Sequence, residues 1–142
     1  MTKILDGKVT SAQIKEELKV AVDELIAAGK KVPHLAAVIV GENGASVTYV
    51  NAKVKTCEAV GFESSLVKLP ADISETDLLS KIEELNNNDA IDGFIVQLPL
   101  PKHIDEEKVT EAIAPGKDVD GFHPENLGKM VLNLETFLPA TP

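Results

Sequence analysis

Apolar residues follow two patterns along the chain, helical spacing and short apolar runs. Segments with these two patterns alternate. Spacing of three and four residues predicts helices over 6–30, 46–60, 75–88 and 105–114. Apolar or loosely alternating runs predict strands over 34–40, 62–69 and 91–98. The region after the last helix is less regular, and 125–130 is expected to form one or two helical turns.

Small polar residues and glycines mark the expected helix ends. Thr10 or Ser11 can cap the first helix, with an earlier start near Asp6 as the alternative. Ser46 is the expected N-cap of the second helix, and Gly61 is its expected stop. These boundaries place a turn rich in glycine between the first strand and the second helix.

The alternation of helices with buried strands predicts an α/β fold, a three-layer α/β/α arrangement with a mainly parallel sheet. We expect residues 1–142 to form one domain. In such sheets, ligands bind beyond the carboxyl ends of the strands. The segments expected to meet there are 41–53, 97–101 and 117–124, although they lie far apart in the sequence.

Composition narrows the class of protein. No apolar run reaches the roughly 18 residues of a membrane span, no signal-peptide pattern is present, and the single Cys57 fits a reducing compartment, so we expect a cytoplasmic protein without membrane contact. The net charge is −9 and all 14 basic residues are lysines. Nucleic-acid binding is therefore not expected, because it depends on basic surfaces that neutralise phosphates.

Tyr49 and Lys53 stand four residues apart and share one face of the second helix, where a phenol and an ammonium can cooperate in proton transfer. Lys55 projects about 200° away around the same helix. Short-chain dehydrogenases use the same spacing, but they need a glycine-rich dinucleotide turn that the residues before Tyr49 lack. A solvated helix face is the alternative interpretation of this pair.

Polar residues in the other two segments allow more than one interpretation. Gln97 ends an apolar strand, so its amide either satisfies nearby backbone or contacts a ligand. Asp118 and Asp120 resemble the start of a calcium loop, but the required glutamate is replaced by Lys129. We expect no metal site, while a metal held by the acidic residues and histidine of this loop remains an alternative.

Three motifs occur in order and together are specific. The chain closely resembles the N-terminal catalytic domain of the bifunctional methylenetetrahydrofolate dehydrogenase/methenyltetrahydrofolate cyclohydrolase family. The resemblance covers essentially the whole chain. The motifs are Tyr49-Val50-x-x-Lys53-x-Lys55-x-Cys57-x-x-Val60-Gly61, Asp92-Gly93-Phe94-Ile95-Val96-Gln97-Leu98-Pro99-Leu100-Pro101 and Pro115-x-Lys117-Asp118-Val119-Asp120-Gly121-Phe122-His123-Pro124-x-Asn126-x-Gly128.

The resemblance implies one site for tetrahydrofolate derivatives that serves two reactions of one-carbon metabolism. It implies that Lys53 is the key catalytic residue, that Tyr49 packs on the folate, that Gln97 tunes the lysine, and that Asp120 anchors the pterin. Hydrolysis of the methenyl bridge needs water addition and a proton for the departing nitrogen, which suits a lysine. Other implied pocket residues are Ser46, Leu98, Pro99, Leu100 and Asp118, the last as a supporting acid.

The resemblance also implies a cofactor and a longer parent protein. Members of the family continue into a Rossmann domain that binds NADP, which this chain is expected to lack, and the parent is expected to be a homodimer. An inactive folate-binding module is the alternative function, and the substrate domain of another two-domain dehydrogenase is a third interpretation. Two positions depart from the family pattern: Gly44, where proline is common, and Ala140, where many members have cysteine.

Overall fold

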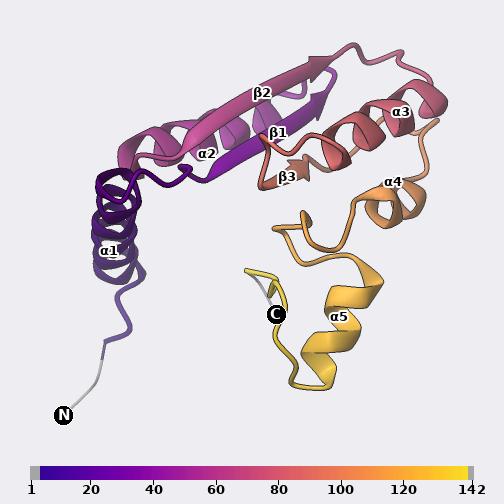
Figure 1. Cartoon of the computed structure of the whole chain (residues 1–142). Helices are drawn as coiled ribbons and strands as arrows, with labels where there is room; N and C mark the ends of the chain where they lie inside the picture. Colours follow the sequence, from indigo (N-terminus) through magenta and orange to yellow (C-terminus); the bar gives the residue numbers. More distant parts are fainter. Residues whose placement is uncertain (1–3, 141–142) are drawn as a thin grey trace.

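The computed structural model describes residues 4–140, so Thr141 and Pro142, which follow Ala140 in the part of the chain covered by the family resemblance, lie outside the described residues. Helices and strands alternate along most of the chain, as the hydrophobic pattern predicts (Figure 1). The elements are α1 (Gly7–Ala27), β1 (His34–Val40), α2 (Gly44–Val60), β2 (Glu63–Leu69), α3 (Glu75–Asn86), β3 (Gly93–Val96), α4 (Glu106–Ala112) and α5 (Pro124–Val131).

The three strands form a parallel sheet in the order β2-β1-β3. Strand β1 is central, with His34 opposite Glu63 on one side and Leu35 opposite Gly93 on the other. Helix α2 covers one face of the sheet, and α3 and α4 lie on the opposite face (Figure 1). The predicted three-layer α/β/α arrangement with a parallel sheet is confirmed.

Strand β3 is shorter than the predicted run over 91–98, because its ladder with β1 covers only Gly93–Val96. Before the strand, the N–H of Ile91 donates to the carbonyl of Asn88 in a turn. After it, Gln97 still donates its N–H to Val38, and Pro99 then offers no N–H to extend the ladder.

Two helix starts differ from the prediction. Asn43, not Ser46, caps α2, because its side-chain oxygen accepts from the N–H groups of Ala45 and Ser46. Asp6 caps α1, which was the alternative to Thr10 or Ser11. The predicted stop of α2 is confirmed, since Gly61 takes the left-handed conformation with φ of 83°.

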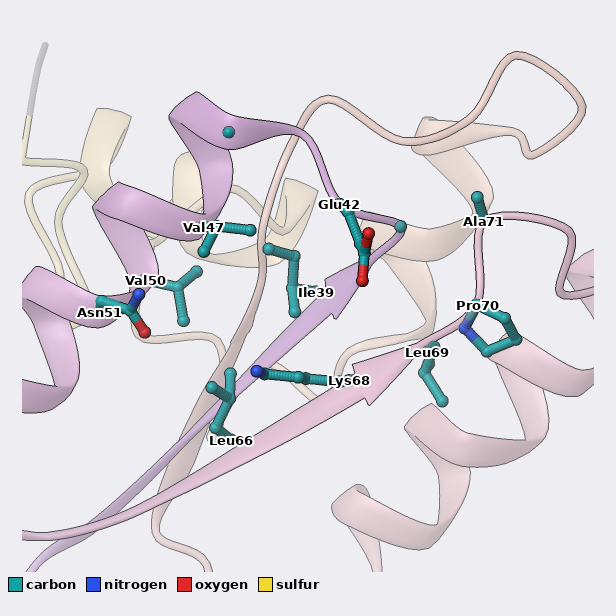
Figure 2. Close-up of a pocket in the computed structure, with 12 residues that line it drawn as sticks. Ile39, Glu42, Val47, Val50, Asn51, Leu66, Lys68, Leu69, Pro70 and Ala71 are labelled. Carbon is teal, nitrogen blue, oxygen red and sulfur yellow. The ribbon is translucent and has the colours of Figure 1, made fainter.

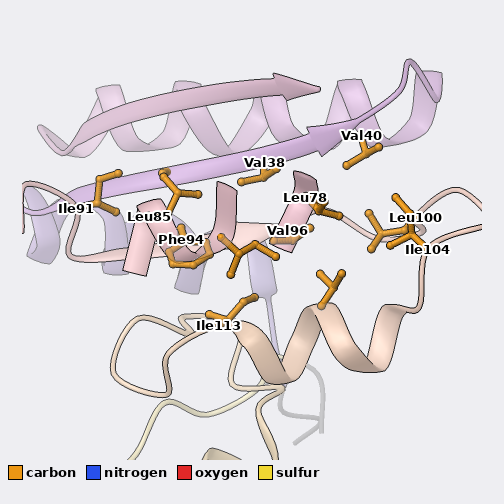
Figure 3. Close-up of a cluster of buried hydrophobic side chains, with 13 residues drawn as sticks. Val38, Val40, Leu78, Leu85, Ile91, Phe94, Val96, Leu100, Ile104 and Ile113 are labelled. Atoms are coloured by element: carbon orange, nitrogen blue, oxygen red, sulfur yellow. The ribbon is translucent and has the colours of Figure 1, made fainter. Parts of the chain in front are cut away.

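The core has two unequal parts, one on each face of the sheet. The α2 face contains four buried apolar residues, Ala37, Ile39, Val50 and Ile95. The opposite face contains thirteen, and Figure 3 shows them filling the space between the strands and the helices. They are Ala36, Val38, Val40, Leu78, Ile82, Leu85, Ile91, Phe94, Val96, Leu100, Ile104, Val109 and Ile113.

Helix α1 extends away from the sheet (Figure 1), and Val22 is its one buried residue. Val22 meets the end of α2, where a side chain on Gly61 would come within 3.1 Å of it. Among the described residues, no helix combines the length and apolar character that a membrane crossing needs.

Candidate functional site

Helix α2 carries three of the predicted site residues, and two of them, Tyr49 and Lys53, lie one turn apart on one face. The ammonium nitrogen of Lys53 lies 5.2 Å from the centre of the Tyr49 ring, a cation–π distance. The Tyr49 side chain is largely exposed, so its ring offers a flat surface for stacking rather than a core contact. Lys55 is exposed and is absent from this arrangement, as its angle around the helix predicts.

A carboxylate from a distant segment faces the lysine. The Lys53 ammonium nitrogen lies 3.8 Å from a carboxylate oxygen of Asp120, and the two side chains are 28% and 36% exposed. An ion pair this accessible contributes at most about 1 kcal/mol to stability, so folding does not require it. Both residues line a groove of about 470 Å³, together with Leu35, Tyr49, Ala52, Thr56, Cys57, Ile95 and Val119.

The Asp120 carboxyl is partly buried, and its surroundings change its pKa. Partial burial raises the pKa of the Asp120 carboxyl above its usual value, the Lys53 ammonium partly opposes this shift, and the nearby Asp118 carboxylate adds to it. Asp120 therefore takes up a proton at a higher pH than an ordinary aspartate does, although it lies beside a cation.

The loop that carries Asp120 runs along the edge of β3. The N–H of Phe94 donates to the carbonyl of Lys117 at 2.9 Å, and Asp118 forms a parallel bridge with Phe94. Val119 packs against the α2 face of the core and directly over Gly93, where an added Cβ would lie 2.3 Å from a Val119 methyl. Gly93 is thus needed for the loop to approach the sheet this closely.

Asp118 is buried, at 2% exposure, and serves inside the protein. One of its carboxylate oxygens accepts from the backbone N–H of His123 at 2.8 Å and from the side-chain amide of Asn126 at 2.9 Å. These bonds tie the loop to α5. They fit the supporting role that the family resemblance implies for Asp118.

Gln97 follows β3 on the side of the sheet that α2 covers. Ile95 belongs to the α2-face cluster, and strand alternation puts Gln97 on that same face. Its amide nitrogen donates to the carbonyl of Leu98 at 2.7 Å, while its amide oxygen is buried and has no partner among residues 4–140. No hydrogen bond joins Gln97 to Lys53 within that range, so the free oxygen is available to a ligand or to a moved lysine.

The other predicted pocket residues lie in different parts of the fold. Ser46 is buried in the first turn of α2, three residues before Tyr49 and seven before Lys53, so it shares their side of the helix. Leu98 and Pro99 follow β3 and are joined by a cis peptide, and Leu98 is partly buried whereas Pro99 is exposed. The side chain of Leu100 belongs to the core of the opposite face, and its substrate contact remains a prediction.

The two departures from the family pattern lie at the start of α2 and at the end of the described chain. Gly44 is the first residue of α2, and a Cβ at this position would meet nothing within 4 Å. Ala140 is exposed at the end of the described chain. Its influence on the folate pocket remains a prediction.

A second, larger cavity lies on the other side of α2 and contains none of the predicted site residues. It measures about 790 Å³ and is bounded by the start of α2 and the ends of β1 and β2. Figure 2 shows Glu42 and Lys68 extending into it between apolar residues. The ion pair of Lys53 with Asp120, beside the exposed Tyr49 ring, favours the Lys53 groove as the reaction site despite its smaller volume.

Two further features of the site bear on its chemistry. Burial raises the pKa of the Cys57 thiol, so this wall residue is a poor nucleophile and fits the role of a small apolar side chain. Within residues 4–140, no three His, Cys, Asp or Glu side chains are placed to hold a metal ion.

Asn126 is a functional candidate that the sequence interpretation missed, because it assigned this residue no role. A polar residue on the buried side of a short helix is the sequence signal that could have indicated such a role.

Comparison with known proteins identifies relatives of the chain. Residues 5–120 match the family described as tetrahydrofolate dehydrogenase/cyclohydrolase, catalytic domain. The "Bifunctional protein FolD" of Cytophaga hutchinsonii is 70% identical over 140 residues, 99% of this chain and 48% of that protein. The protein of the same name from Flavobacterium psychrophilum is 65% identical over 98% of this chain and 47% of its own.

Solved structures show the same similarity. The bifunctional FolD enzyme of Campylobacter jejuni superimposes with a TM-score of 0.94 at 48% identity, over 99% of this chain and 50% of that one. The Trypanosoma brucei dehydrogenase-cyclohydrolase, solved with an NADP cofactor and inhibitor, gives a TM-score of 0.90 at 33% identity, over 97% and 48%. The chain spans about half the length of the curated relatives it matches. Because the family match covers most of its residues, the chain belongs to the tetrahydrofolate dehydrogenase/cyclohydrolase family, whose catalytic domain it matches.

Proposed function

We propose that this chain binds a reduced folate in the groove beside Lys53 and hydrolyses methenyltetrahydrofolate to formyltetrahydrofolate. The observation that carries the proposal is the meeting of Lys53, Tyr49 and Asp120 in one groove of a member of this family. Lysine, phenol and carboxylate come from two distant segments, and the exposed Lys53–Asp120 pair adds too little stability to explain their meeting.

Each side chain has a distinct part in the proposed reaction. Tyr49 stacks on the folate ring system, and Asp120 accepts hydrogen bonds from the amino-pyrimidine edge of the pterin. Water then adds to the methenyl carbon and releases one proton to solvent. The Lys53 ammonium protonates the departing ring nitrogen as the carbon–nitrogen bond breaks, and the Lys53 amine that results takes the remaining hydroxyl proton as the formyl carbonyl forms. The unpartnered oxygen of Gln97 accepts a hydrogen bond from Lys53 once the substrate has drawn the lysine inward.

The second reaction proposed for the whole protein is oxidation of methylenetetrahydrofolate to the methenyl form, with hydride passing to NADP. The residues described here do not fit that cofactor. The turn after β1 reads Gly41-Glu42-Asn43-Gly44, where Asn43 occupies the first N–H groups of α2 and Glu42 adds a negative charge. A pyrophosphate needs those N–H groups free, so we assign no NADP contact to this chain and derive no hydride step from it.

An inactive folate-binding module is the competing function, and one pair of measurements separates the two. Tyr49 is the only tyrosine and the chain has no tryptophan, so its fluorescence reports on this groove. Both functions predict saturable quenching when methenyltetrahydrofolate is added. Only the enzyme predicts loss of methenyltetrahydrofolate absorbance faster than in buffer, and an unchanged rate would contradict the proposed hydrolysis.

The proposal extends to the setting of the whole protein. We propose that it works in the cytoplasm, in one-carbon metabolism, and as a homodimer. Sedimentation of the complete gene product tests the dimer directly, since a monomer at assay concentration would exclude it.

A further inference from the structure

Asn126 is a buried asparagine whose amide nitrogen and oxygen both form hydrogen bonds. At 2% exposure, its nitrogen donates to the carbonyl of Pro115 at 3.0 Å and to the carboxylate of Asp118 at 2.9 Å. Its oxygen accepts from the hydroxyl of Thr136 at 2.7 Å. One amide thus connects the start of the 117–121 loop, the loop itself and the segment that follows α5.

The same loop is fixed from its other sides. Val119 is seated over Gly93, and Gly121 has φ of 69° with no room for a Cβ, which would lie 2.9 Å from the Phe137 carbonyl oxygen. Asp120 stands between these two anchors and is held by neither of them through its side chain. Its direction toward Lys53 is therefore set by the backbone on either side of it, and two residues earlier the buried carboxylate of Asp118 is hydrogen-bonded to Asn126.

We propose that Asn126 is a positioning residue for Asp120, which acts by holding Asp118 and with it the backbone that aims the Asp120 carboxylate into the groove. Thr136 completes the arrangement by fixing the orientation of the Asn126 amide. The inference rests on the proposed folate function and deepens it, because it names what sets the geometry of the pterin contact.

If Asn126 only stabilised the fold, its variants should behave like those of another hydrogen-bonded asparagine. Asn86 provides this matched control. Asn86 is a partly buried asparagine whose nitrogen donates to Ala112 and whose oxygen accepts from Ala114. Asn86→Ala removes hydrogen bonds of the same kind, which connect α3 to the end of α4 and do not involve the side chains of Asp118 or Asp120. If Asn126 matters only for folding, the two variants should resemble each other in every assay.

The test compares KM and kcat for methenyltetrahydrofolate hydrolysis in the complete gene product, at a temperature where circular dichroism shows each variant folded. Asn126→Ala should raise KM about tenfold with a smaller fall in kcat, whereas Asn86→Ala should keep KM within about twofold. Thr136→Val, which removes one bond to the same amide, should raise KM by less than Asn126→Ala does, and it serves where the alanine variant fails to fold.

A double-mutant cycle shows whether the effect passes through Asp120. In an Asp120→Asn background, Asn126→Ala should have almost no further effect on KM, since the contact it positions is already altered. An equal rise in KM in both backgrounds would overturn the proposal. So would an equal rise in the Asn86→Ala control.

A measurement that does not depend on activity distinguishes failure of the proposed folate function from failure of the positioning role of Asn126. If the wild-type protein neither binds nor hydrolyses the folate, the proposed function fails, and the NMR signal of the Asp120 carboxyl carbon then decides the positioning role. A shift of that signal in Asn126→Ala but not in Asn86→Ala supports it. Equal responses of the two variants, or no response in either, contradict it.

Discussion

The two faces of the central sheet are built differently. One face is closed by α3, α4 and the segment after β3, with thirteen buried apolar residues. The other is covered by α2 and the loop that carries Val119, with four buried apolar residues, and has a cavity on each side of that helix. The closed face fixes the positions of the strands, and the open face leaves room beside α2 for polar side chains and a ligand. Tyr49, Lys53 and Asp120 all belong to the open face.

The largest expected difference between the faces is in stability. Leu78 is fully buried on the closed face, so Leu78→Ala should lower the free energy of unfolding by about 3 kcal/mol. Val54 is a half-buried residue of α2 that packs on the open face, and Val54→Ala should lower the free energy of unfolding by about 1 kcal/mol. Urea unfolding measures both, and equal losses would show that the open face is as tightly packed as the closed one.

A second comparison concerns what the open face offers to a ligand. Tyr49 is 62% exposed, so its ring contributes little to folding. Tyr49→Ala should raise KM for the folate about tenfold, while Tyr49→Phe should stay within about twofold because the stacking surface remains. Steady-state kinetics of the two variants is the measurement. A large loss of kcat in Tyr49→Phe would instead make the phenol a proton-transfer group.

The start of α2 determines how the open face is presented. Asn43→Ala removes the N-cap and should lower the free energy of unfolding by about 1 kcal/mol. Ser46→Ala, at the position that the sequence had indicated as the cap, should change stability by less than about 0.5 kcal/mol. Thermal or urea unfolding of the pair distinguishes the two capping assignments.

The smallest expected effect is electrostatic. Because the folded-state pKa of Asp120 is raised, its ionisation opposes folding progressively as the pH rises above the unfolded pKa, and in full above the folded pKa. Asp120→Asn should therefore be slightly more stable than wild type at neutral pH. The difference should vanish below the unfolded pKa near 3.8, where both states carry the proton. Melting temperatures across this range measure the difference, and a constant difference would contradict the assignment.

The same shift has a consequence for binding. If the Asp120 carboxylate anchors the pterin, folate affinity should begin to fall on acidification at a higher pH than an unperturbed aspartate would allow. Tyr49 fluorescence titrations at a series of pH values follow the affinity. In Asp120→Asn, the affinity should be weaker and lose this pH dependence, and a retained dependence would assign it to another group.

Local patterns in the sequence were sufficient for most of the fold. The continuous apolar run of β1 predicts a strand covered on both faces, and the spacing in α2 predicts the Tyr49–Lys53 face. Features set by long-range contacts were not predictable in this way. The carboxylate of the buried Asp118 bonds to Asn126 in α5, and the cap of α2 depends on where the turn after β1 ends. The length of β3 likewise follows from its register with β1.

In the candidate site, too, the residues could be predicted from the sequence but their contacts could not. Lys53 and Asp120 could be named from their motifs, but their contact depends on the loop at 117–121 running beside β3. Spacing gives no information on that placement, because Gly93 and Val119 create it by close packing between separate segments. The unpartnered oxygen of Gln97 is likewise a property of the folded surroundings.

The central claim is that Lys53 is the proton-handling residue of a folate site on the open face. Its most direct test is the rate at which methenyltetrahydrofolate absorbance is lost in Lys53→Ala and in the matched variant Lys55→Ala, which removes an exposed lysine two residues away on another side of the same helix. We predict that Lys53→Ala reduces turnover by about a thousandfold and that Lys55→Ala remains within about twofold of wild type. Near-normal turnover in Lys53→Ala, or an equal loss in both variants, would contradict the account.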